Sequence, residues 1–436
     1  LLNDPYKGGT HLPDITCIQP YFVGQNLCFF VANRAHHSDV GGITPGSMPL
    51  ATEIFQEGII IPPLKLYHKG KLNEEILNLF LANVRTPEER RGDIMAQVAA
   101  NARGAKRLSE MIQRYGLEKL TTYADQVQDY TEKTLRQTIK SIPDGLYHFE
   151  DYLDDDGVSE QPVKIAVTLT VQGEEVWVDF SGSSPQVAGS INANFAVTCS
   201  AVLYVFRSLV EEDIPFNTGM MQPIHIVAPE GSVVNAVFPS ALAGGNVETS
   251  QRIVDVLLGA LSQALPGKIP AASQGTMNNI AFGGFNPKIK ANFAYYETIG
   301  GGMGASSQAP GLDGVHCHMT NSLNTPIEAL ENYLPIKITK YAYRKRSGGK
   351  GKNSGGNGLV REYQFLVPAN LTIISDRRKF QPYGLAGGKP GKKGLNLLLR
   401  KKKRLVLGSK VNLKVEAGDV LRIETPGGGG YGKPKR

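Results

Sequence analysis

Two short runs near the start of the chain are rich in β-branched and aromatic residues, a composition that predicts strands. They cover Ile15–Val23 and Leu27–Ala32, and Gly24-Gln25-Asn26 between them suits a hairpin turn. A hairpin brings the residue before its first strand close to the residue after its second strand. We therefore expect Asp14 and His36 to be neighbours in space, although they lie far apart in the sequence.

The next part of the chain carries two apolar patterns with helical spacing. The first begins at Thr86-Pro87-Glu88-Glu89, where threonine suits the cap, proline the first turn and the second glutamate a capping box, and it runs to about Tyr115. Gly116 ends it. The second pattern lies between Leu120 and Ile139 and stops at Pro143-Asp144-Gly145. Two consecutive helices with a short connection predict a helical hairpin.

Strands and helices alternate in the middle of the chain. Apolar and polar residues alternate over Lys164–Val171 and Glu174–Phe180, on either side of Gln172-Gly173, which predicts a β-hairpin. Phe195–Val210 is apolar on nearly every side and predicts a buried helix. Thr249–Leu265 has an apolar stripe at helical spacing, so we expect a further helix there.

The last third of the chain has a different pattern of predicted elements. A loop-rich segment, Gly283–Gly314, is followed by short strands and turns. The strands expected there are Leu359–Leu366, Leu371–Ser375, Leu395–Leu399, Leu405–Leu407, Val411–Val415 and Val420–Glu424. The fold class predicted from these patterns is α+β, a mixed multi-layer fold. We expect a metal-bearing hairpin with a helical hairpin in residues 1–145, an α/β central region in 146–335 and a β-rich module in 336–436.

Length and composition narrow the classes of protein. A chain of 436 residues, 41% hydrophobic and 20% charged, is long enough for two or three ordinary domains. No apolar run is long enough for a transmembrane helix, so we expect no membrane association. The chain begins inside what reads as a loop, and we expect that a segment upstream is missing. Four scattered cysteines exclude a disulfide framework and fit the cytoplasm.

The net charge of +7 comes with lysines and arginines concentrated in 337–346 and 389–404. Aromatic residues do not interleave with these charges as stacking platforms for bases would. We therefore interpret the basic segments as a solvated surface and expect no nucleic-acid partner.

The densest group of potential metal ligands lies in Leu1–Gly42. It consists of His11, Asp14, His36, His37 and Asp39. Mixed nitrogen and oxygen ligands suit Zn, Mn or Fe(II), and the lack of thiolates favours a catalytic site with an open position over a closed structural one. The alternative is that these histidines are hydrogen-bonded loop residues. Two of the five, His37 and Asp39, would also suit the role of orienting a ligand imidazole.

Two further segments are candidates for binding. His316 and His318, in a group with Cys317, Asn321 and Glu328, follow a glycine-rich loop and would share one face of a strand, although an ordinary strand and turn explains them equally well. Gly244–Ser250 precedes a helix and would offer backbone N–H groups to an anion, or simply cap that helix. The glycine run at 300–304 lacks the Gly-Lys-Ser/Thr of a P-loop, so we expect no nucleotide site in this chain.

Several long motifs closely resemble those of the hydantoinase B/5-oxoprolinase family, and they occur in the same order. They are NDPYKGGTHLPDI, ANRAHHSDVGG, GNVETSQRIVDVLLGAL, YYETIGGGMGA, HMTNSLNTPIEALE and the closing TPGGGGYG. The resemblance implies an ATP-dependent system in which an A-type, actin-like ATPase phosphorylates a cyclic amide. The B-type component resembled here would carry a divalent metal, Zn or Mn first and Fe next, and complete the hydrolysis.

The resemblance also implies the metal ligands, and a hydrolysis at this metal suggests roles for further residues. Three metal ligands fall on His11, Asp14 and His36, and a remaining acidic ligand is expected upstream of the NDPY motif, with Asp39 or water filling its place here. Proton transfer is expected from His37, Asp39 or Glu248. Substrate or phosphate binding is expected from four further residues: Arg34, Arg252, His316 and His318.

Three functions stay open at this point. The first is a cytoplasmic hetero-oligomer with the A-type hydantoinase/oxoprolinase ATPase subunit, which binds ATP, acting on a small cyclic amide. The second is a subunit of an ATP-dependent acetone- or acetophenone-type carboxylase, in which the same metal binds bicarbonate or an activated carboxyl donor. The third is a non-catalytic scaffold subunit whose histidines brace a loop.

Overall fold

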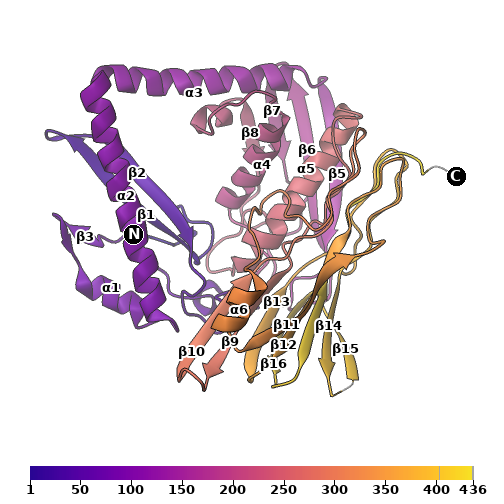
Figure 1. Cartoon of the computed structure of the whole chain (residues 1–436). Coiled ribbons are helices and arrows are strands. Elements are labelled where there is room, and N and C mark those ends of the chain that lie inside the picture. The colour runs from indigo at the N-terminus through magenta and orange to yellow at the C-terminus, as the bar shows by residue number, and fades with distance from the viewer. Residues whose placement is uncertain (402, 435–436) are drawn as a thin grey trace.

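The computed structural model describes residues 1–401 and 403–434. Within these residues the chain forms six α-helices and five sheets, arranged in several layers (Figure 1). This confirms the predicted α+β class. None of the described helices combines the length and the apolar composition that a membrane crossing requires.

The N-terminal hairpin consists of β1 (Asp14–Val23) and β2 (Asn26–His36), which pair antiparallel. One face of this hairpin lies on α2 (Pro87–Tyr115), and Gly104 permits the close approach, since a Cβ there would lie 2.6 Å from Cγ1 of Val31. Short elements complete this region around a small apolar core: η1 (Ile54–Gln56), β3 (Tyr67–His68), β4 (Lys71–Leu72) and α1 (Glu74–Leu81).

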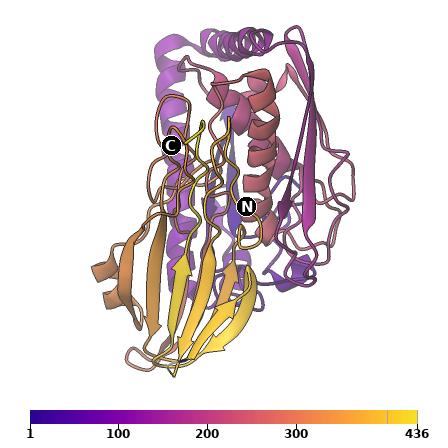
Figure 2. The same ribbon diagram turned by 90° about the vertical axis from the view of Figure 1, so that its right-hand side faces the viewer.

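The two predicted helices α2 and α3 (Leu117–Lys140) are both present, but α3 does not fold back along α2. Gly116 joins them with φ of +81° and ψ of 152°. In Figure 1, α3 crosses the top of the molecule, and Figure 2 shows the same corner from the side. The reason is packing: Leu135 and Ile139 of α3 are buried in the core of the central region, not against α2.

The central region contains a four-stranded sheet of β5 (Gly145–Leu153), β6 (Val163–Gln172), β7 (Glu175–Asp179) and β8 (Ile224–Val227), in that order. The predicted hairpin is the β6–β7 pair. The two predicted helices are α4 (Phe195–Leu209) and α5 (Ser250–Ala264), whose apolar residues join those of the sheet in one core. A short 3-10 helix, η2 (Thr218–Met221), precedes β8, and one π-helical turn, η3 (Gly245–Thr249), leads directly into α5.

Two sheets pack face to face in the last third of the chain (Figure 2). One contains β10 (Ala291–Glu297), β9 (Asn279–Asn286), β13 (Ala369–Ile374) and β16 (Lys410–Val415), in that order. The other contains β11 (Ile336–Arg344), β12 (Gly358–Phe365), β17 (Val420–Glu424), β14 (Leu395–Arg400) and β15 (Lys403–Leu407). The helix α6 (Ile327–Tyr333) leads into β11.

All six strands predicted in the last third are present. The boundary expected at residue 335 nevertheless passes through a sheet, because β9 and β10 precede it and pair with strands that follow it. Residues 279–297 therefore belong with the C-terminal layers. The sequence contains no signal for this, since a strand pattern does not name the strand's partner.

Candidate metal centre

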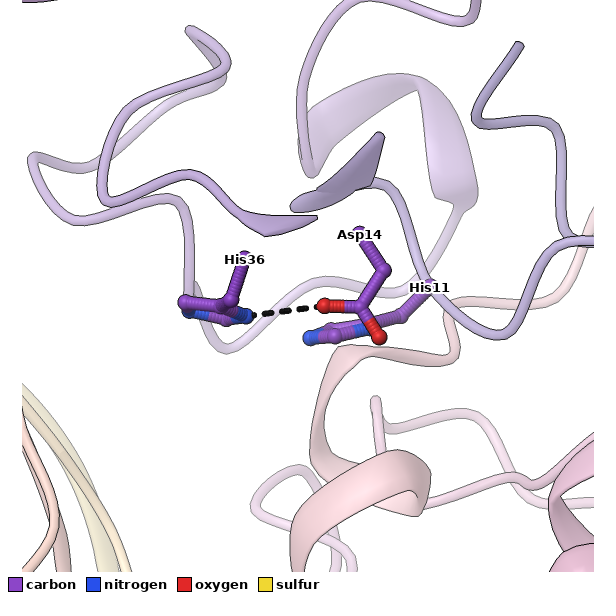
Figure 3. A group of neighbouring side chains, drawn as sticks. All are labelled: His11, Asp14 and His36. Atoms are coloured by element: carbon purple, nitrogen blue, oxygen red, sulfur yellow. Dashed lines mark hydrogen bonds and ion pairs between the residues drawn. The ribbon is translucent and has the colours of Figure 1, made fainter. Parts of the chain in front are cut away.

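Three side chains at the base of the β1–β2 hairpin form a compact group, the ligand cluster: His11, Asp14 and His36 (Figure 3). Asp14 is the first residue of β1, His36 is the last residue of β2, and the strand register places them directly opposite each other. Nδ1 of His36 lies 3.1 Å from Oδ1 of Asp14. Nδ1 of His11, in the turn that enters β1, lies 3.5 Å from Oδ2 of the same carboxylate. The predicted proximity of Asp14 and His36 is thus confirmed.

The protonation states of this cluster suit metal binding. Burial lowers the pKa of His11, which is fully buried, so its imidazole is neutral and offers a lone pair. Burial opposes ionisation of Asp14, but interactions with His11 and His36 outweigh it and hold the pKa of Asp14 well below its usual value. The Thr10 hydroxyl donates a further hydrogen bond to Oδ2 of Asp14 (2.9 Å).

The cluster also fits a metal geometrically. Bonds of about 2.1 Å from a metal to nitrogen and oxygen give ligand-to-ligand distances of roughly 3.0–3.4 Å at octahedral or tetrahedral angles. The separations of 3.1 and 3.5 Å are close to this range. Nδ1 of His11 is buried and has no hydrogen-bond partner in the described part of the chain, which is costly for a polar atom unless something else binds it.

A cavity of about 350 Å³ opens beside His36. Its wall includes Tyr296 of β10, whose ring centroid lies 5.1 Å from that of His36. The His11 ring stacks on the His36 ring, with the two centroids 5.2 Å apart. The His36 side chain is 33% exposed, so the cluster has one open side. The rest of the lining is mostly uncharged: Asn246, Val247, Met277, Tyr295, Glu297, Thr298, Met319, Thr320, Asn321, Ser322, Leu323 and Thr325.

The segment Gly244–Ser250 meets this site through a side chain. Its π-helical turn places Nδ2 of Asn246 3.5 Å from Nε2 of His11. Gly245 lies so close to Asn192 that a Cβ there would be 1.8 Å from the Asn192 carbonyl oxygen, so this turn requires glycine.

The neighbouring candidates His37 and Asp39 lie outside the cluster. Successive side chains of an extended segment point to opposite faces, and His37 points toward α2, where Nε2 lies 2.9 Å from Oε1 of Gln97. Asp39 accepts hydrogen bonds from the backbone N–H groups of Arg85 (2.5 Å) and Thr86 (3.0 Å). It therefore fixes the two residues that lead into α2. Thr86, the residue predicted to cap this helix, makes no capping bond through its side chain.

Glu248 and Arg252 are buried away from the ligand cluster. Glu248 does not contact it directly, since Asn279 and Tyr296 lie between them. Arg252 belongs to a closed group of charges, the ion cluster, in which its guanidinium contacts Asp151 (2.7 Å) and Asp376 (3.0 Å). The members of the ion cluster are Arg252, Arg377, Lys410, Asp151, Asp255 and Asp376, and Asp155 adjoins it through Lys410 (3.6 Å).

Arg34 lies on the same face of the hairpin as His36, two residues along β2. Its guanidinium donates to the Thr16 hydroxyl (2.9 Å) and to the Gly8 carbonyl (3.1 Å), and the side chain is otherwise partly exposed. It is therefore a cation close to the cluster on the open face.

His316 and His318 lie in a loop and not in a strand, with φ of +59° at His318. His318 turns toward the Tyr204 hydroxyl on α4 (3.3 Å), and His316 contacts Thr320, which lines the cavity (3.4 Å). Of the five residues in that predicted group, only Asn321 lines the cavity itself.

Two residues at the site, Asn246 and Tyr296, are not identified by reasoning from the sequence. Asn246 follows two glycines in a segment that is itself a candidate anion site, so that pattern is a usable signal. Tyr296 carries no such signal, because its position beside His36 depends on the packing of β10 against the hairpin base.

The fold and the site together define a class: multi-layer α+β proteins with an imidazole–carboxylate cluster at the base of a two-stranded hairpin. The sequence model described as Hydantoinase B/oxoprolinase matches residues 1–434. The chain belongs to the hydantoinase B/oxoprolinase family.

Three curated relatives match nearly all of this chain over different shares of their own length. The uncharacterized protein MJ0963 of Methanocaldococcus jannaschii is 42% identical over all of this chain and 76% of its own length. The 5-oxoprolinase 1 of Arabidopsis thaliana is 41% identical over 99% of this chain, which spans 35% of that protein. A protein of Pseudomonas sp. (strain NS671), named as one of the subunits of a D-/L-hydantoinase, is 33% identical over 99% of this chain and 75% of its own length.

Two solved structures share the fold. The ATP-dependent caprolactamase of Pseudomonas jessenii has a TM-score of 0.92 at 27% identity, covering 99% of this chain and 76% of that chain. A nucleotide-free acetone carboxylase structure has a TM-score of 0.90 at 19% identity, covering 99% of this chain and 64% of that chain, and at this identity only the fold is comparable.

Proposed function

We propose that this chain is the metal-bearing part of an ATP-dependent amidohydrolase that opens a cyclic amide, such as a hydantoin, 5-oxoproline or another lactam. The observation that carries the proposal is the ligand cluster, with its neutral imidazole, its ionised carboxylate and its partly exposed histidine beside a cavity. Zn²⁺ or Mn²⁺ suits this donor set best, and Fe²⁺ comes next.

The three residues of the ligand cluster differ in how firmly they are held. A divalent metal held by His11, Asp14 and His36 would supply Lewis acidity toward a carbonyl oxygen and activate a water. His11 and Asp14 are the more buried members and hold their positions, while His36 lies at the edge of the cavity. The Asn246 amide, beside His11 and on the cavity wall, would donate a hydrogen bond to a ring carbonyl.

The hairpin face next to the cluster suits an anionic group. Arg34 is partly exposed there, and its bonds to Thr16 and Gly8 fix the direction of the guanidinium. It would hold the phosphate of a substrate that has been activated elsewhere. His37 and Asp39 receive no catalytic role in this proposal, because their contacts fix them to α2 and to the residues that lead into it.

We place the phosphorylation step in a partner, an A-type ATPase that is either a separate subunit or a fused segment, in a cytoplasmic complex. The sequence contains no P-loop motif, and this chain spans only 35% of the plant 5-oxoprolinase. The Pseudomonas relative is named as one subunit of a larger enzyme. These observations support a division of labour in which ATP binds to the partner.

The test begins with metal content. The full chain would be loaded with Zn²⁺ or Mn²⁺, passed through a desalting column and analysed for bound metal, beside Asp14→Ala, His36→Ala and the control His148→Ala. The control histidine is exposed on β5, where it contacts the Thr168 hydroxyl. We expect about one metal in wild type and control and none in the two ligand variants.

Activity is then measured with the partner and ATP. We expect ring-opened product from the wild-type complex and none from Asp14→Ala or His36→Ala, with the partner's nucleotide binding unchanged. A wild-type chain that retains no metal would contradict the proposal and favour a non-catalytic scaffold. Incorporation of labelled bicarbonate without ring opening would instead support the carboxylase alternative.

A further inference from the structure

His36 is the least restrained member of the ligand cluster. Its side chain is 33% exposed, and its one side-chain hydrogen bond in the described structure joins Nδ1 to Asp14. Its ring is otherwise held by two other rings, those of His11 and Tyr296, whose centroids lie 5.2 and 5.1 Å away. The orientation of His36 therefore depends on what holds Tyr296.

Tyr296 is fixed through its hydroxyl, which donates to Oδ1 of Asn279 (2.8 Å). The Asn279 amide cannot turn over, because its Nδ2 donates to the Ile374 carbonyl (2.7 Å) and to Oε1 of Glu248 (2.8 Å). Both ends of this amide thus have a defined partner, and the tyrosine hydroxyl has one direction to point in.

We propose that Glu248 is a positioning residue that acts through Asn279 and Tyr296 to fix the ring of His36 for metal binding. This inference rests on the proposed metal centre and adds a supporting set of residues to it. Such outer contacts commonly set the orientation and strength of a ligand histidine.

The surroundings of Glu248 favour its uncharged form at neutral pH. The carboxyl is fully buried, and its Oε1 also accepts from the Met277 backbone N–H (3.1 Å). Burial, and next the charge of Asp376, raise the pKa of Glu248 to about 8, so the group is protonated at neutral pH. Glutamine reproduces a protonated carboxyl in shape and in its accepting oxygen, whereas leucine removes the acceptor.

The π-helical turn η3 connects the two sides of the site. It carries Asn246, beside His11, and Glu248, two residues further on, within the chain of contacts that ends at His36. This one turn therefore contacts His11 directly, through Asn246, and His36 indirectly, through Asn279 and Tyr296. A turn with this geometry is a common feature of functional sites in helices.

The experiment uses Co²⁺ alone as the probe on the full chain, because its visible absorption reports the coordination geometry. The variants are Tyr296→Phe, which keeps the ring and removes the hydroxyl, Glu248→Leu and Glu248→Gln. Tyr21→Phe and Glu57→Gln are matched controls. Tyr21 loses one hydroxyl bond, to Ser109, and Glu57 is a buried carboxyl whose pKa burial likewise raises to about 8.

We expect Tyr296→Phe and Glu248→Leu to lower the Co²⁺ affinity by on the order of 10-fold and to change the absorption spectrum. Glu248→Gln and both controls should stay within about 2-fold of wild type, with the wild-type spectrum. Rescue by glutamine separates a positioning role from a general loss of folding, which thermal midpoints monitor. If Glu248→Leu does not fold, Tyr296→Phe still decides the matter.

Two outcomes would overturn the proposal. One is wild-type affinity and spectrum in Tyr296→Phe. The other is an equal loss in Tyr21→Phe or Glu57→Gln, which would show that the loss is not specific to the path through Asn279. Failure of the wild-type chain itself to bind Co²⁺ is distinguishable from both, because it contradicts the metal centre and not only its support.

Discussion

The ligand cluster and the ion cluster are built from similar side chains but differ in what closes them. In the ion cluster each of the three aspartates contacts a guanidinium or an ammonium group, and Arg252 and Arg377 are fully buried. In the ligand cluster one carboxylate faces two imidazoles, and one side opens to a cavity.

The comparison shows that the basic residue beside the aspartates, arginine or histidine, decides whether a cluster is structural or can bind a metal. Arginine keeps its proton under all ordinary conditions, so the arginines of the ion cluster offer no lone pair to a metal and neutralise the aspartates beside them. Histidine loses its proton readily, and burial favours this for His11. The ion cluster therefore connects β5, α5 and the segment after β13, whereas the ligand cluster can accept a further ion.

The largest effect is expected where the ion cluster is broken. Asp376→Ala removes the carboxylate that contacts Arg252 (3.0 Å) and Lys410 (3.2 Å) and leaves two buried cations without it. We expect a loss of about 3–5 kcal/mol in the free energy of unfolding. Urea denaturation followed by the fluorescence of Trp177 measures this change.

Asp14→Ala is the matched comparison, because it removes the carboxylate of the ligand cluster, whose partners are two histidines. We expect it to cost at most about 1 kcal/mol while abolishing metal binding. Equal destabilisation by both substitutions would show that the two clusters do the same structural work, contrary to the distinction between them.

The local parts of the fold could be predicted from the sequence. The strand composition around Gly24-Gln25-Asn26 predicts the hairpin and hence that Asp14 and His36 lie close together. Their direct pairing also depends on a bulge between Tyr21 and Phe22, which shifts the register set by the turn by one residue. The cap-like start at Pro87 and the glycine at 116 predict the limits of α2. These features depend on residues close together in the chain.

The predictions that were wrong concern residues whose roles depend on partners far away in the sequence. An arginine in an apolar helix reads equally well as a substrate ligand or as a buried ion pair, and only the arrival of Asp151 and Asp376 assigns Arg252 to the second. His36 and His37 are adjacent and chemically identical, yet one faces the cavity and the other faces Gln97. The two side chains point to opposite faces because they are successive residues of an extended segment at the end of β2.

A smaller effect is expected from pH. The folded state raises the pKa of the buried carboxyls Glu57 and Glu248 from 4.5 to about 8 through burial. The unfolded chain releases these protons first, so the stability they contribute is complete below pH 4.5 and is lost as the pH rises through 8. The expected slope is about 1.4 kcal/mol per pH unit for each carboxyl.

The carboxylates that are paired with arginine make stability depend on pH in the opposite direction. Although burial opposes ionisation of Asp151, Arg377 and Arg252 lower its pKa from 3.8 to about 2, so its contribution is present above pH 3.8 and lost as the pH falls through 2. We expect Glu57→Gln to flatten the decline of the unfolding midpoint between about pH 5 and 8 and to leave the acid limb unchanged. An unaltered slope in that variant would contradict the assignment of the decline to buried carboxyls.

The smallest effect concerns the two adjacent histidines. His37→Gln removes the imidazole that lies 2.9 Å from Gln97 and packs edge-on against Phe80 on the covered side of the hairpin. We expect a loss of roughly 1 kcal/mol in stability, from one buried hydrogen bond and some packing, with metal affinity within about 2-fold of wild type. Isothermal titration with Zn²⁺ and urea denaturation on the same sample measure both quantities. A large loss of metal affinity would place His37 in the ligand cluster and remove the distinction between its two faces. If only stability falls, then the alternation of side chains at the end of β2 separates a metal ligand from a structural histidine one residue away.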